Sequence, residues 1–291
     1  MKNVRILLTG AKGQLGQSIT DRWENDPQIE LLATDIEALD ICDPIALEQA
    51  FSNFNPDFCL NGAAYTAVDL AENEQEKAMT INAQAVKNLC IACKSHNTTL
   101  LHISSDYVYD SWPVKLLTES APTRPKSIYG QSKLLGDQLI INHLNNYFIF
   151  RTSWLYSEYG NNFVKTILRL SQSRPEIQVV DDQYGSPTYA GDLAEALKYL
   201  VLAGKTRDFP PFGIYNFSNE GFTNWFEFAS NILEFAGKTG FPLKRISTKA
   251  FGSPAPRPTN SKMSKKKFQK HFNFPLRDWK ESLSECIQAL T

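Results

Sequence analysis

The sequence has few cysteines, no long hydrophobic run and no excess of charge of either sign. Its 291 residues include five cysteines, an odd number spread along the chain, which does not make a disulfide framework. No stretch approaches the ~18 consecutive apolar residues of a membrane helix, and the apolar run near the start is too short for a signal sequence. Lys and Arg number 30 against 31 Asp and Glu, so no net field favours nucleic acid or an anionic membrane. These absences predict a cytoplasmic protein that binds neither nucleic acid nor a membrane.

Two of the cysteines, Cys90 and Cys93, have the spacing of a redox pair. They fall late in an expected helix over residues 80–96, whereas thiolates are stabilised at a helix amino terminus. No zinc-like pair of ligands comes after them. We therefore expect two small apolar residues on a buried face.

Short apolar strands alternate with helical patterns through the first half of the chain. Strands are expected at residues 4–9, 29–35, 57–61 and 99–105, with helices between them. This alternation predicts an α/β fold, a doubly wound parallel sheet of the Rossmann-like kind with right-handed crossovers. Ligands of such sheets bind at the carboxyl ends of the strands.

A glycine-rich turn joins the first strand to the first helix. Gly10, Gly13 and Gly16 let the backbone turn sharply and approach a phosphate at the positive end of that helix. Asp35 closes the second strand about twenty residues beyond the glycines, where a carboxylate can accept hydrogen bonds from a ribose diol. A carboxylate there favours NAD over NADP by repulsion, whereas Lys12 could meet an additional phosphate. NADPH and NADH both remain open as the cofactor.

A second group of residues has the chemistry of a proton donor. Tyr129 and Lys133 lie four apart on an expected helix and so point to the same side. The ammonium is expected to lower the pKa of the phenol, and a nearby hydroxyl from Ser105 could orient a carbonyl oxygen. His102, inside the fourth strand, is interpreted as a packed core residue.

The second half of the chain is expected to add a smaller lobe. The dinucleotide-binding domain is predicted over residues 1–155, with returning segments at about 177–220, and the substrate-binding lobe over 156–176 and 221–291. Further strands are expected at 148–153, 177–180 and 213–218, and further helices at 161–173, 192–202, 222–236 and 278–290, with Thr223 capping the third of these helices. Residues 250–258 are expected to form an irregular loop, and Lys265–Lys267 a solvated helix face.

Longer motifs support a resemblance to a known family. The glycine turn, Ser105 and the Tyr129-x-x-x-Lys133 pair resemble the extended short-chain dehydrogenase/reductase superfamily. Closer signatures resemble its dTDP-4-dehydrorhamnose reductase family, and they extend almost to the end of the chain. They are NGAAYTAVD at residues 61–69, SSDYVY at 104–109, FRTSWLY at 150–156, GNNF at 160–163, DQYGSPT at 182–188 and PRPTNS at 256–261.

The resemblance implies an activity and a set of site residues. The activity would be NAD(P)H-dependent reduction of the 4-keto group of a nucleotide sugar, dTDP-4-dehydro-L-rhamnose, with Tyr129 as general acid and Lys133 and Ser105 assisting. The implied cofactor-binding residues are Gly10, Gly13, Gln14, Leu15, Asp35, Asp40, Ile41, Ala64, Tyr65, Thr66, Tyr129 and Lys133. The implied substrate-binding residues are Ser105, Asp106, Trp154 and Arg257, the last of these beside the diphosphate.

Two departures from the family pattern matter. Many members have Thr where this chain has Ser105, and both residues supply the hydroxyl. Some members dimerise through Mg²⁺ held by carboxylates, one of them at the start of the first helix, where this chain has Gln17 and Ser18. We therefore expect no required metal, and either a monomer or a homodimer.

Two other functions remain open. A 4,6-dehydratase or 4-epimerase would use the same fold, although dehydratases typically have an Asp-Glu pair directly after the catalytic hydroxyl and here Tyr107 comes after Asp106. A non-catalytic regulatory subunit, like that of methionine adenosyltransferase, shares much of the pattern. The intact Ser105, Tyr129 and Lys133 favour an enzyme.

Overall fold

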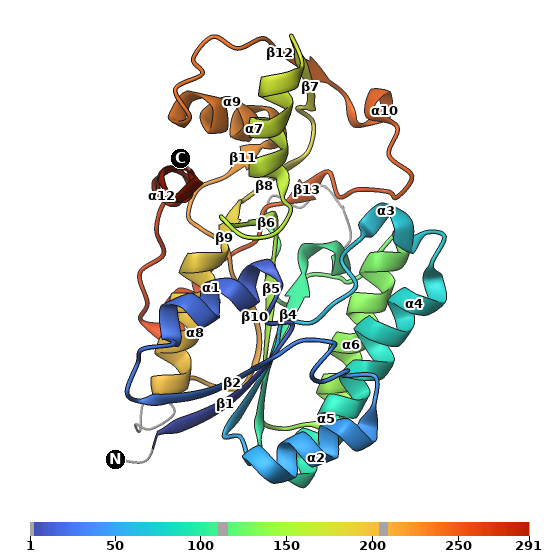
Figure 1. The fold of residues 1–291 in the computed structure, drawn as a ribbon. Helices are drawn as coiled ribbons and strands as arrows, with labels where there is room; N and C mark the ends of the chain where they lie inside the picture. The colour runs from blue at the N-terminus through green and yellow to red at the C-terminus, as the bar shows by residue number, and fades with distance from the viewer. Residues whose placement is uncertain (1–2, 110–115, 204–208, 291) are drawn as a thin grey trace.

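A parallel sheet of six strands forms the centre of the larger part of the molecule (Figure 1). The computed structural model describes residues 3–109, 116–203 and 209–290. The strands are arranged in the order β2-β1-β3-β4-β5-β10, and each adjacent pair is parallel. Their bounds are β1 Val4–Thr9, β2 Ile29–Thr34, β3 Phe58–Asn61, β4 Thr99–Ser105, β5 Tyr147–Thr152 and β10 Gly213–Asn216.

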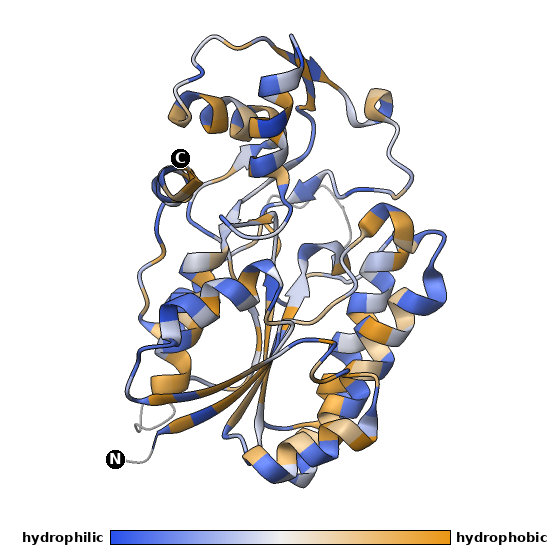
Figure 2. Ribbon diagram, in the orientation of Figure 1, coloured by the Kyte–Doolittle hydropathy of each residue, from blue (hydrophilic) through white to orange (hydrophobic). Residues whose placement is uncertain are grey.

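Helices cover both faces of this sheet because alternate residues of each strand are apolar on opposite sides. In β1, Ile6 and Leu8 pack into the core shared with helices α1 and α8, whereas Leu7 packs into the core of the other face. Figure 2 shows the strands largely in the colour of hydrophobic residues. On one face lie α1 (Gln14–Trp23), α8 (Ala190–Ala203) and α11 (Lys266–Phe272), and on the other α2 (Pro44–Phe54), α5 (Ala85–Ser95) and α6 (Ile128–His143).

The predicted doubly wound fold is confirmed. The strand order reverses at β1, which lies between β2 and β3, so the crevice above these strand ends is the position where such sheets bind ligands. Cys90 and Cys93 are free, buried members of the core beneath α5, as expected.

A smaller lobe stands over the carboxyl ends of the strands (Figure 1). Its core lies among α7 (Phe163–Ser173), α9 (Trp225–Phe235) and α12 (Trp279–Leu290). Three small sheets complete it: β7 (Ile177–Val180) with β12 (Leu243–Ile246), β8 (Tyr184–Gly185) with β11 (Thr223–Asn224) and β13 (Asn260–Ser261), and β6 (Leu155–Tyr156) with β9 (Thr188–Tyr189). The remaining short helices are α3 (Val68–Ala71), α4 (Gln75–Met79), η1 (Thr80–Gln84), η2 (Asp106–Val108) and α10 (Thr248–Phe251).

Four of the local expectations need correction, one of them only at its boundary. Residues 177–180 do not return to the main sheet but pair with β12, because only Ile177 and Val179 are buried, which suits a strand covered on one face. Helix α9 begins one residue after its cap Asn224, which accepts a hydrogen bond from the Glu227 N–H, so Thr223 is not the cap. The expected irregular loop is confirmed over residues 252–258, whereas residues 250 and 251 belong to the end of α10.

The fourth expectation that needs correction is the solvated helix face at Lys265–Lys267. Lys265 is buried, and its ammonium donates to the carbonyl of Asn219 at 3.1 Å. Lys267 donates to the carbonyl of Ile214 at 2.7 Å, so these side chains attach α11 to neighbouring segments instead of forming a solvated face.

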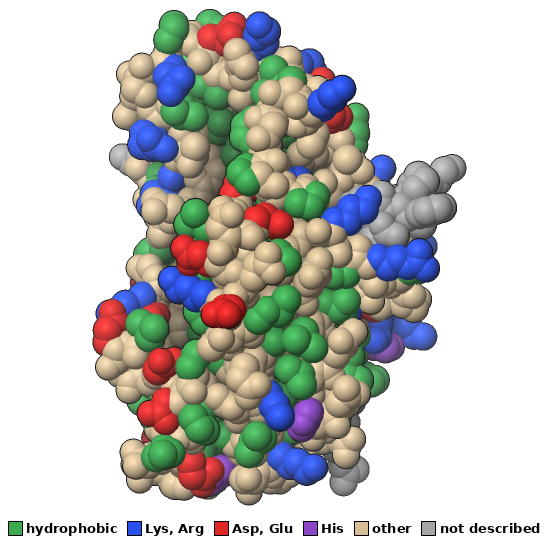
Figure 3. Space-filling view, turned by 90° about the vertical axis from the view of Figure 1, so that its right-hand side faces the viewer, with side chains coloured by type: hydrophobic (Ala, Val, Ile, Leu, Met, Phe, Trp, Pro, Cys, Tyr) green, Lys and Arg blue, Asp and Glu red, His purple; other side chains and the backbone are tan. Residues whose placement is uncertain are grey.

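The described residues carry charges of both signs on the face that includes the outer helices. Figure 3 shows acidic and basic side chains interspersed there among hydrophobic and neutral ones. Among the described residues, no helix is both long enough and apolar enough to cross a membrane.

The glycine turn yields a prediction about stability. A Cβ at Gly16 would lie 2.2 Å from the carbonyl oxygen of Gly10, whereas a Cβ at Gly13 would meet that oxygen only at 3.2 Å. Gly16→Ala should therefore lower the free energy of unfolding by about 1–3 kcal/mol through overpacking against backbone. Gly13→Ala, the matched control, should change it by less than about 1 kcal/mol. Urea unfolding of the two variants checks this, and equal losses would contradict it.

Candidate active site

A cleft of about 1530 Å³ lies between the carboxyl ends of the main strands and the smaller lobe. Pockets for one small ligand occupy about 300–1,000 Å³, so this cleft has room for two. All but one of the residues proposed from the sequence line it. They are Gly10, Gly13, Gln14, Leu15, Asp35, Asp40, Ile41, Ala64, Thr66, Ser105, Asp106, Tyr129, Lys133, Trp154 and Arg257.

The amino terminus of α1 points into this cleft. Gly13 is the N-cap residue and supplies no side-chain hydrogen bond to the first turn. Gly10 has φ +71° and passes so close to Ala63 that a Cβ would lie 2.6 Å from the Ala63 nitrogen. The turn therefore presents backbone N–H groups and the positive end of a helix dipole without a side chain above them, which suits a diphosphate.

Asp35 stands at the end of β2, on the same rim. Its carboxylate accepts hydrogen bonds from the backbone N–H groups of Lys12 at 2.7 Å and Ile36 at 2.8 Å. The Lys12 ammonium forms an exposed ion pair with Glu37 at 2.8 Å. The rim thus has both a carboxylate for a ribose and a cation that an additional phosphate could approach. Nearby, Asp40 accepts a hydrogen bond from the Cys42 N–H at 2.8 Å.

Tyr65 is the one proposed cofactor residue that does not line the cleft. Its backbone N–H donates to the Asn82 side chain at 2.9 Å, and its hydroxyl donates to Glu74 at 3.2 Å. The segment at the end of β3 is thereby fixed by Asn82 in η1, and the Tyr65 ring turns away from the cleft. Its neighbours Ala64 and Thr66 do line the cleft, and a contact between Tyr65 and the cofactor stays a prediction.

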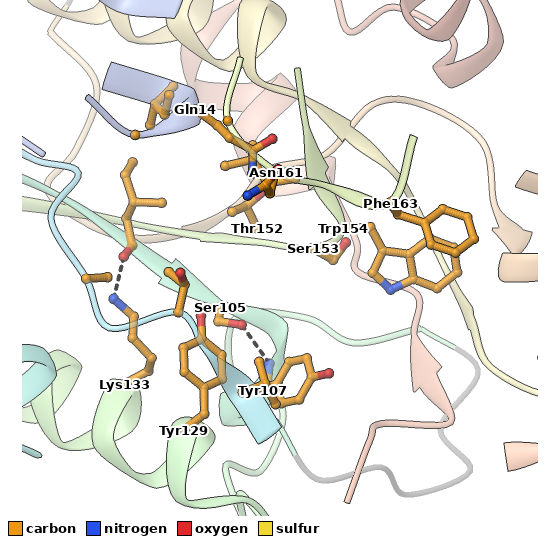
Figure 4. A pocket seen from close by; sticks show the side chains of 18 of the residues that line it. Gln14, Ser105, Tyr107, Tyr129, Lys133, Thr152, Ser153, Trp154, Asn161 and Phe163 are labelled. Carbon is orange, nitrogen blue, oxygen red and sulfur yellow. Dashed lines mark hydrogen bonds between the residues drawn. The ribbon is translucent and has the colours of Figure 1, made fainter. Parts of the chain in front are cut away.

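Tyr129, Lys133 and Ser105 meet where α6 packs against the end of β4. Ser127 caps the helix by accepting from the Gly130 N–H at 3.1 Å, which sets Tyr129 in the first turn. The phenol oxygen of Tyr129 points toward the Ser105 hydroxyl (Figure 4). Burial raises the pKa of Tyr129 far above its usual range, and the hydrogen bond with Ser105 opposes that rise.

Lys133 does not lower the pKa of the phenol, contrary to the expectation from sequence. Its ammonium donates to the carbonyl of Ile103 at 2.8 Å and lies 3.4 Å from Nε2 of His102. Burial lowers the pKa of Lys133 to about 8, and the Asp137 carboxylate opposes that change. Burial dominates the pKa of the phenol, so Tyr129 keeps its proton and can donate it.

Asp106 is a buried carboxyl next to this pair. It accepts hydrogen bonds from Ser105 at 3.2 Å and from Ser261 of the smaller lobe. Burial raises the pKa of Asp106 to about 6, although both hydrogen bonds oppose the rise. The two lobes are thus joined at a group that titrates near neutral pH.

Aromatic rings form the wall of the cleft on the side of the smaller lobe. Trp154 and Phe163 lie close together in this wall (Figure 4). Trp154 stacks on Trp225 with ring centroids 3.8 Å apart, and the ring centroids of Phe163 and Trp225 are 4.5 Å apart. Trp154 has a left-handed backbone with φ +51°. Such a wall suits a flat or apolar face of a ligand.

Arg257 lies at the opposite side of the opening. Its guanidinium pairs with Asp69 at 2.6 Å and donates to the Tyr107 hydroxyl at 3.2 Å. Tyr107 in turn packs edge-on against Tyr129, with ring centroids 5.3 Å apart. The guanidinium is thus placed at the cleft and held in a defined position.

Sequence reasoning missed several residues of the wall. With the exception of Trp225, these residues lie within the motifs that support the family resemblance, but only tertiary packing brings their segments to the cleft. They include Thr152, Ser153, Asn161, Phe163, Gln183, Trp225 and Ser261.

The amino terminus of α1 also bears on the question of a metal. Gln17 donates to the carbonyl of Lys12 at 2.7 Å, and Ser18 donates to that of Gln14 at 3.0 Å. No group of three or more His, Cys, Asp or Glu side chains that could hold a metal ion occurs in the part of the chain that the structure describes. The expectation of no required metal stays a prediction.

The fold and this site are typical of dinucleotide-dependent oxidoreductases. The chain matches the model of the RmlD substrate binding domain over residues 4–291 and belongs to that family. It is 38% identical to a dTDP-4-dehydrorhamnose reductase of Aggregatibacter actinomycetemcomitans, over 96% of this chain and 97% of that one. It is 37% identical to the spore coat polysaccharide biosynthesis protein SpsK of Bacillus subtilis, over 98% and 97% of the two chains. Among solved structures, a dTDP-4-dehydrorhamnose reductase from Bacillus anthracis in complex with NADP superposes with a TM-score of 0.93, at 36% identity over 99% of this chain and 100% of that one.

The buried carboxyl of Asp106 predicts a pH-dependent stability. Its pKa is raised to about 6, above the ordinary value near 3.9, so the native state holds this proton more tightly than the unfolded chain. The stabilisation is fully present below about pH 4 and is lost as the pH rises through about 6. Asp106→Asn, which stays uncharged, should therefore gain up to about 3 kcal/mol relative to the parent between pH 4 and pH 7.5. Denaturant unfolding at the two pH values checks this, and a difference that does not change with pH would refute it.

Proposed function

We propose that the protein catalyses the NAD(P)H-dependent reduction of dTDP-4-dehydro-L-rhamnose to dTDP-L-rhamnose. The observation that carries the proposal is the pairing of Tyr129 with Ser105 in a cleft that also contains the open amino terminus of α1. The family and the reductases among the relatives support the same chemistry.

The residues of the main domain fit a dinucleotide. Gly13, Gln14 and Leu15 would receive the diphosphate on backbone N–H groups, and Asp35 would accept hydrogen bonds from the adenosine ribose. Asp40 and Ile41 would lie beside the adenine, and Ala64 and Thr66 beside the nicotinamide. When bound, the reduced nicotinamide supplies the hydride for the keto carbon.

Tyr129 then supplies the proton. Addition of hydride to a carbonyl carbon places negative charge on its oxygen, and a hydrogen-bond donor already aimed at that oxygen stabilises the charge as it develops. Ser105 orients the same oxygen, and the Tyr129 phenol transfers its proton to it. Burial keeps the phenol protonated until a stronger base forms beside it.

The substrate is held by residues from both lobes. Arg257 would pair with the diphosphate in place of Asp69, since a guanidinium matches phosphate oxygens with two parallel hydrogen bonds. Asp106 would accept a hydrogen bond from a sugar hydroxyl, and Trp154 would cover one face of the sugar.

A dehydratase is less favoured because Tyr107 stands directly after Asp106. Elimination chemistry in this superfamily typically uses an Asp-Glu pair, and Tyr107 occupies the second position with its hydroxyl directed to Arg257. An epimerase and a non-catalytic regulatory subunit remain as alternatives that an assay with the keto sugar distinguishes.

Three further properties stay predictions. The first is the division into a dinucleotide-binding domain (1–155, with about 177–220) and a substrate lobe (156–176 and 221–291). The second is a monomer or homodimer without nucleic acid or membrane partners. The third is a location in the cytoplasm. Among these, the three small sheets and the core of α7, α9 and α12 support a separate lobe, although residues 177–180 belong with it.

The direct experiment mixes purified protein with dTDP-4-dehydro-L-rhamnose and NADPH, then with NADH. Consumption of the reduced cofactor, with dTDP-L-rhamnose formed in equal amount, is the expected result. Conversion of the sugar without net cofactor consumption would favour an epimerase. Absence of any reaction, together with tight binding to a methionine adenosyltransferase, would favour the regulatory subunit.

Removing the phenolic proton should abolish most of the turnover. Tyr129→Phe should lower kcat by roughly two to four orders of magnitude and leave the Kd for NADPH almost unchanged, as expected for loss of a positioned acid. Tyr107→Phe is the matched control, because it deletes the neighbouring phenol that is bonded to Arg257 instead of Ser105. The control should change kcat by less than about tenfold. Ordinary turnover by Tyr129→Phe would mean that the proton comes from another group.

A further inference from the structure

A row of three buried polar side chains crosses the sheet beneath α6. Thr9 of β1, Asn61 of β3 and His102 of β4 are register partners on adjacent strands, and all three are buried. The Thr9 Oγ1 and Asn61 Oδ1 atoms are 2.8 Å apart, and Asn61 Nδ2 lies 3.0 Å from His102 Nδ1. Since buried polar groups are costly unless bonded, a continuous row in a sheet centre calls for an explanation.

The row ends on the catalytic lysine. His102 Nε2 lies 3.4 Å from Lys133 Nζ, and the other acceptor of that amine is the Ile103 carbonyl at 2.8 Å. Both acceptors are neutral, and the nearby carboxylate of Asp137 is paired with Arg151 at 3.0 Å. The charged groups that face this row are therefore Lys133 and Asp137 from α6 and Arg151 from β5, while β1 and β3 contribute only the neutral Thr9 and Asn61.

A neutral imidazole has one donor and one acceptor nitrogen, so the row has two fully bonded arrangements. With a charged Lys133, Nε2 of His102 accepts, Nδ1–H donates to the Asn61 amide oxygen, and the amide nitrogen donates to Thr9. With an uncharged Lys133, Nε2–H donates to the amine, Nδ1 accepts from the amide nitrogen, and Thr9 donates to the amide oxygen. The two ends of an amide have the same shape, and a hydroxyl can donate or accept, so both arrangements fit the same positions.

We propose that His102 is a positioning residue that holds the Lys133 amine in both of its protonation states by changing tautomer. Between the two arrangements the pair loses one proton in total: ammonium and Nδ1–H imidazole become amine and Nε2–H imidazole. This inference rests on the proposed reductase function for its kinetic test, which takes the charged form of Lys133, in the same cleft as Tyr129, as the active one. Burial lowers the pKa of Lys133 to about 8 and holds the pKa of His102 well below its ordinary value, so the lysine titrates while the imidazole stays neutral.

The tautomer is measured without any assay of activity. The chain has four histidines, so long-range ¹H–¹⁵N spectra of the imidazoles separate into few signals. His102 Nε2 should be an unprotonated acceptor at low pH and carry the proton at high pH, with a midpoint at the pKa of Lys133, near pH 8. In Lys133→Met the tautomer should not change with pH. A wild-type tautomer that is constant from about pH 6 to about pH 10 would overturn the proposal.

Kinetics supply the second test. His102→Leu removes an acceptor from the buried ammonium, which should lower the pKa of Lys133. The fall of kcat on the alkaline side of its pH profile (the alkaline limb) should therefore begin roughly one pH unit lower. His102→Gln keeps an acceptor and should place the limb between those of the parent and the Leu variant, even if the Leu variant folds poorly. Ile149→Val is the matched control, because Ile149 is the register partner of His102 on β5 and is equally buried, and its limb should not move.

The outcomes separate the two proposals. Wild-type protein that reduces no nucleotide sugar contradicts the proposed function, whereas the tautomer experiment still decides the role of His102. Active His102 variants whose alkaline limb stays at the parent pH, with only lower stability, would make His102 a packing residue and overturn the inference.

Discussion

The hydrogen bond from the Lys133 ammonium to the Ile103 carbonyl fixes the position of α6 on the sheet. One helical turn rises about 5.4 Å, and two residues of a strand span about 6.6 Å. With Lys133 held at Ile103, Tyr129 therefore arrives beside Ser105, two residues further along β4. A buried lysine that bonds a main-chain carbonyl thus contributes, together with the Ser127 cap, to the position of the phenol beside Ser105.

The cleft is closed by polar contacts between parts distant in sequence. The Gln14 side chain accepts from Asn162 at 2.9 Å, which joins the first turn of α1 to the loop before α7. Arg257 reaches Asp69, and Ser261 reaches Asp106, across the other side. Since at least one partner of each contact lines the cleft, a ligand that binds Gln14, Arg257 or Asp106 there competes with these contacts. Ligand binding is consequently linked to the position of one lobe relative to the other.

Much of the fold and most of the candidate site could be predicted because their signals are local. A strand, a glycine turn and a helix indicate a phosphate site within twenty residues, and Tyr129 and Lys133 share a helix face by spacing alone. Tyr65 and Lys265 could not be placed in this way because tertiary contacts decide their direction. Asn82 holds the backbone of Tyr65, whose ring packs in a buried cluster beside the cleft, and the Asn219 carbonyl holds Lys265 in the interior. The effect of Lys133 on the phenol could not be predicted for another reason. Sequence shows that two groups are neighbours but not how deeply both are buried, and burial dominates here.

The backbone of Trp154 is strained, and the place of its ring in the cleft wall explains why the strain is kept. A bulky residue with φ +51° is in a conformation that glycine adopts with far less strain. A glycine at this position would relax the backbone but would delete the ring that covers Trp225 and forms part of the cleft wall. The strain of the backbone and the stacking of the ring in the cleft wall therefore oppose each other at a single residue.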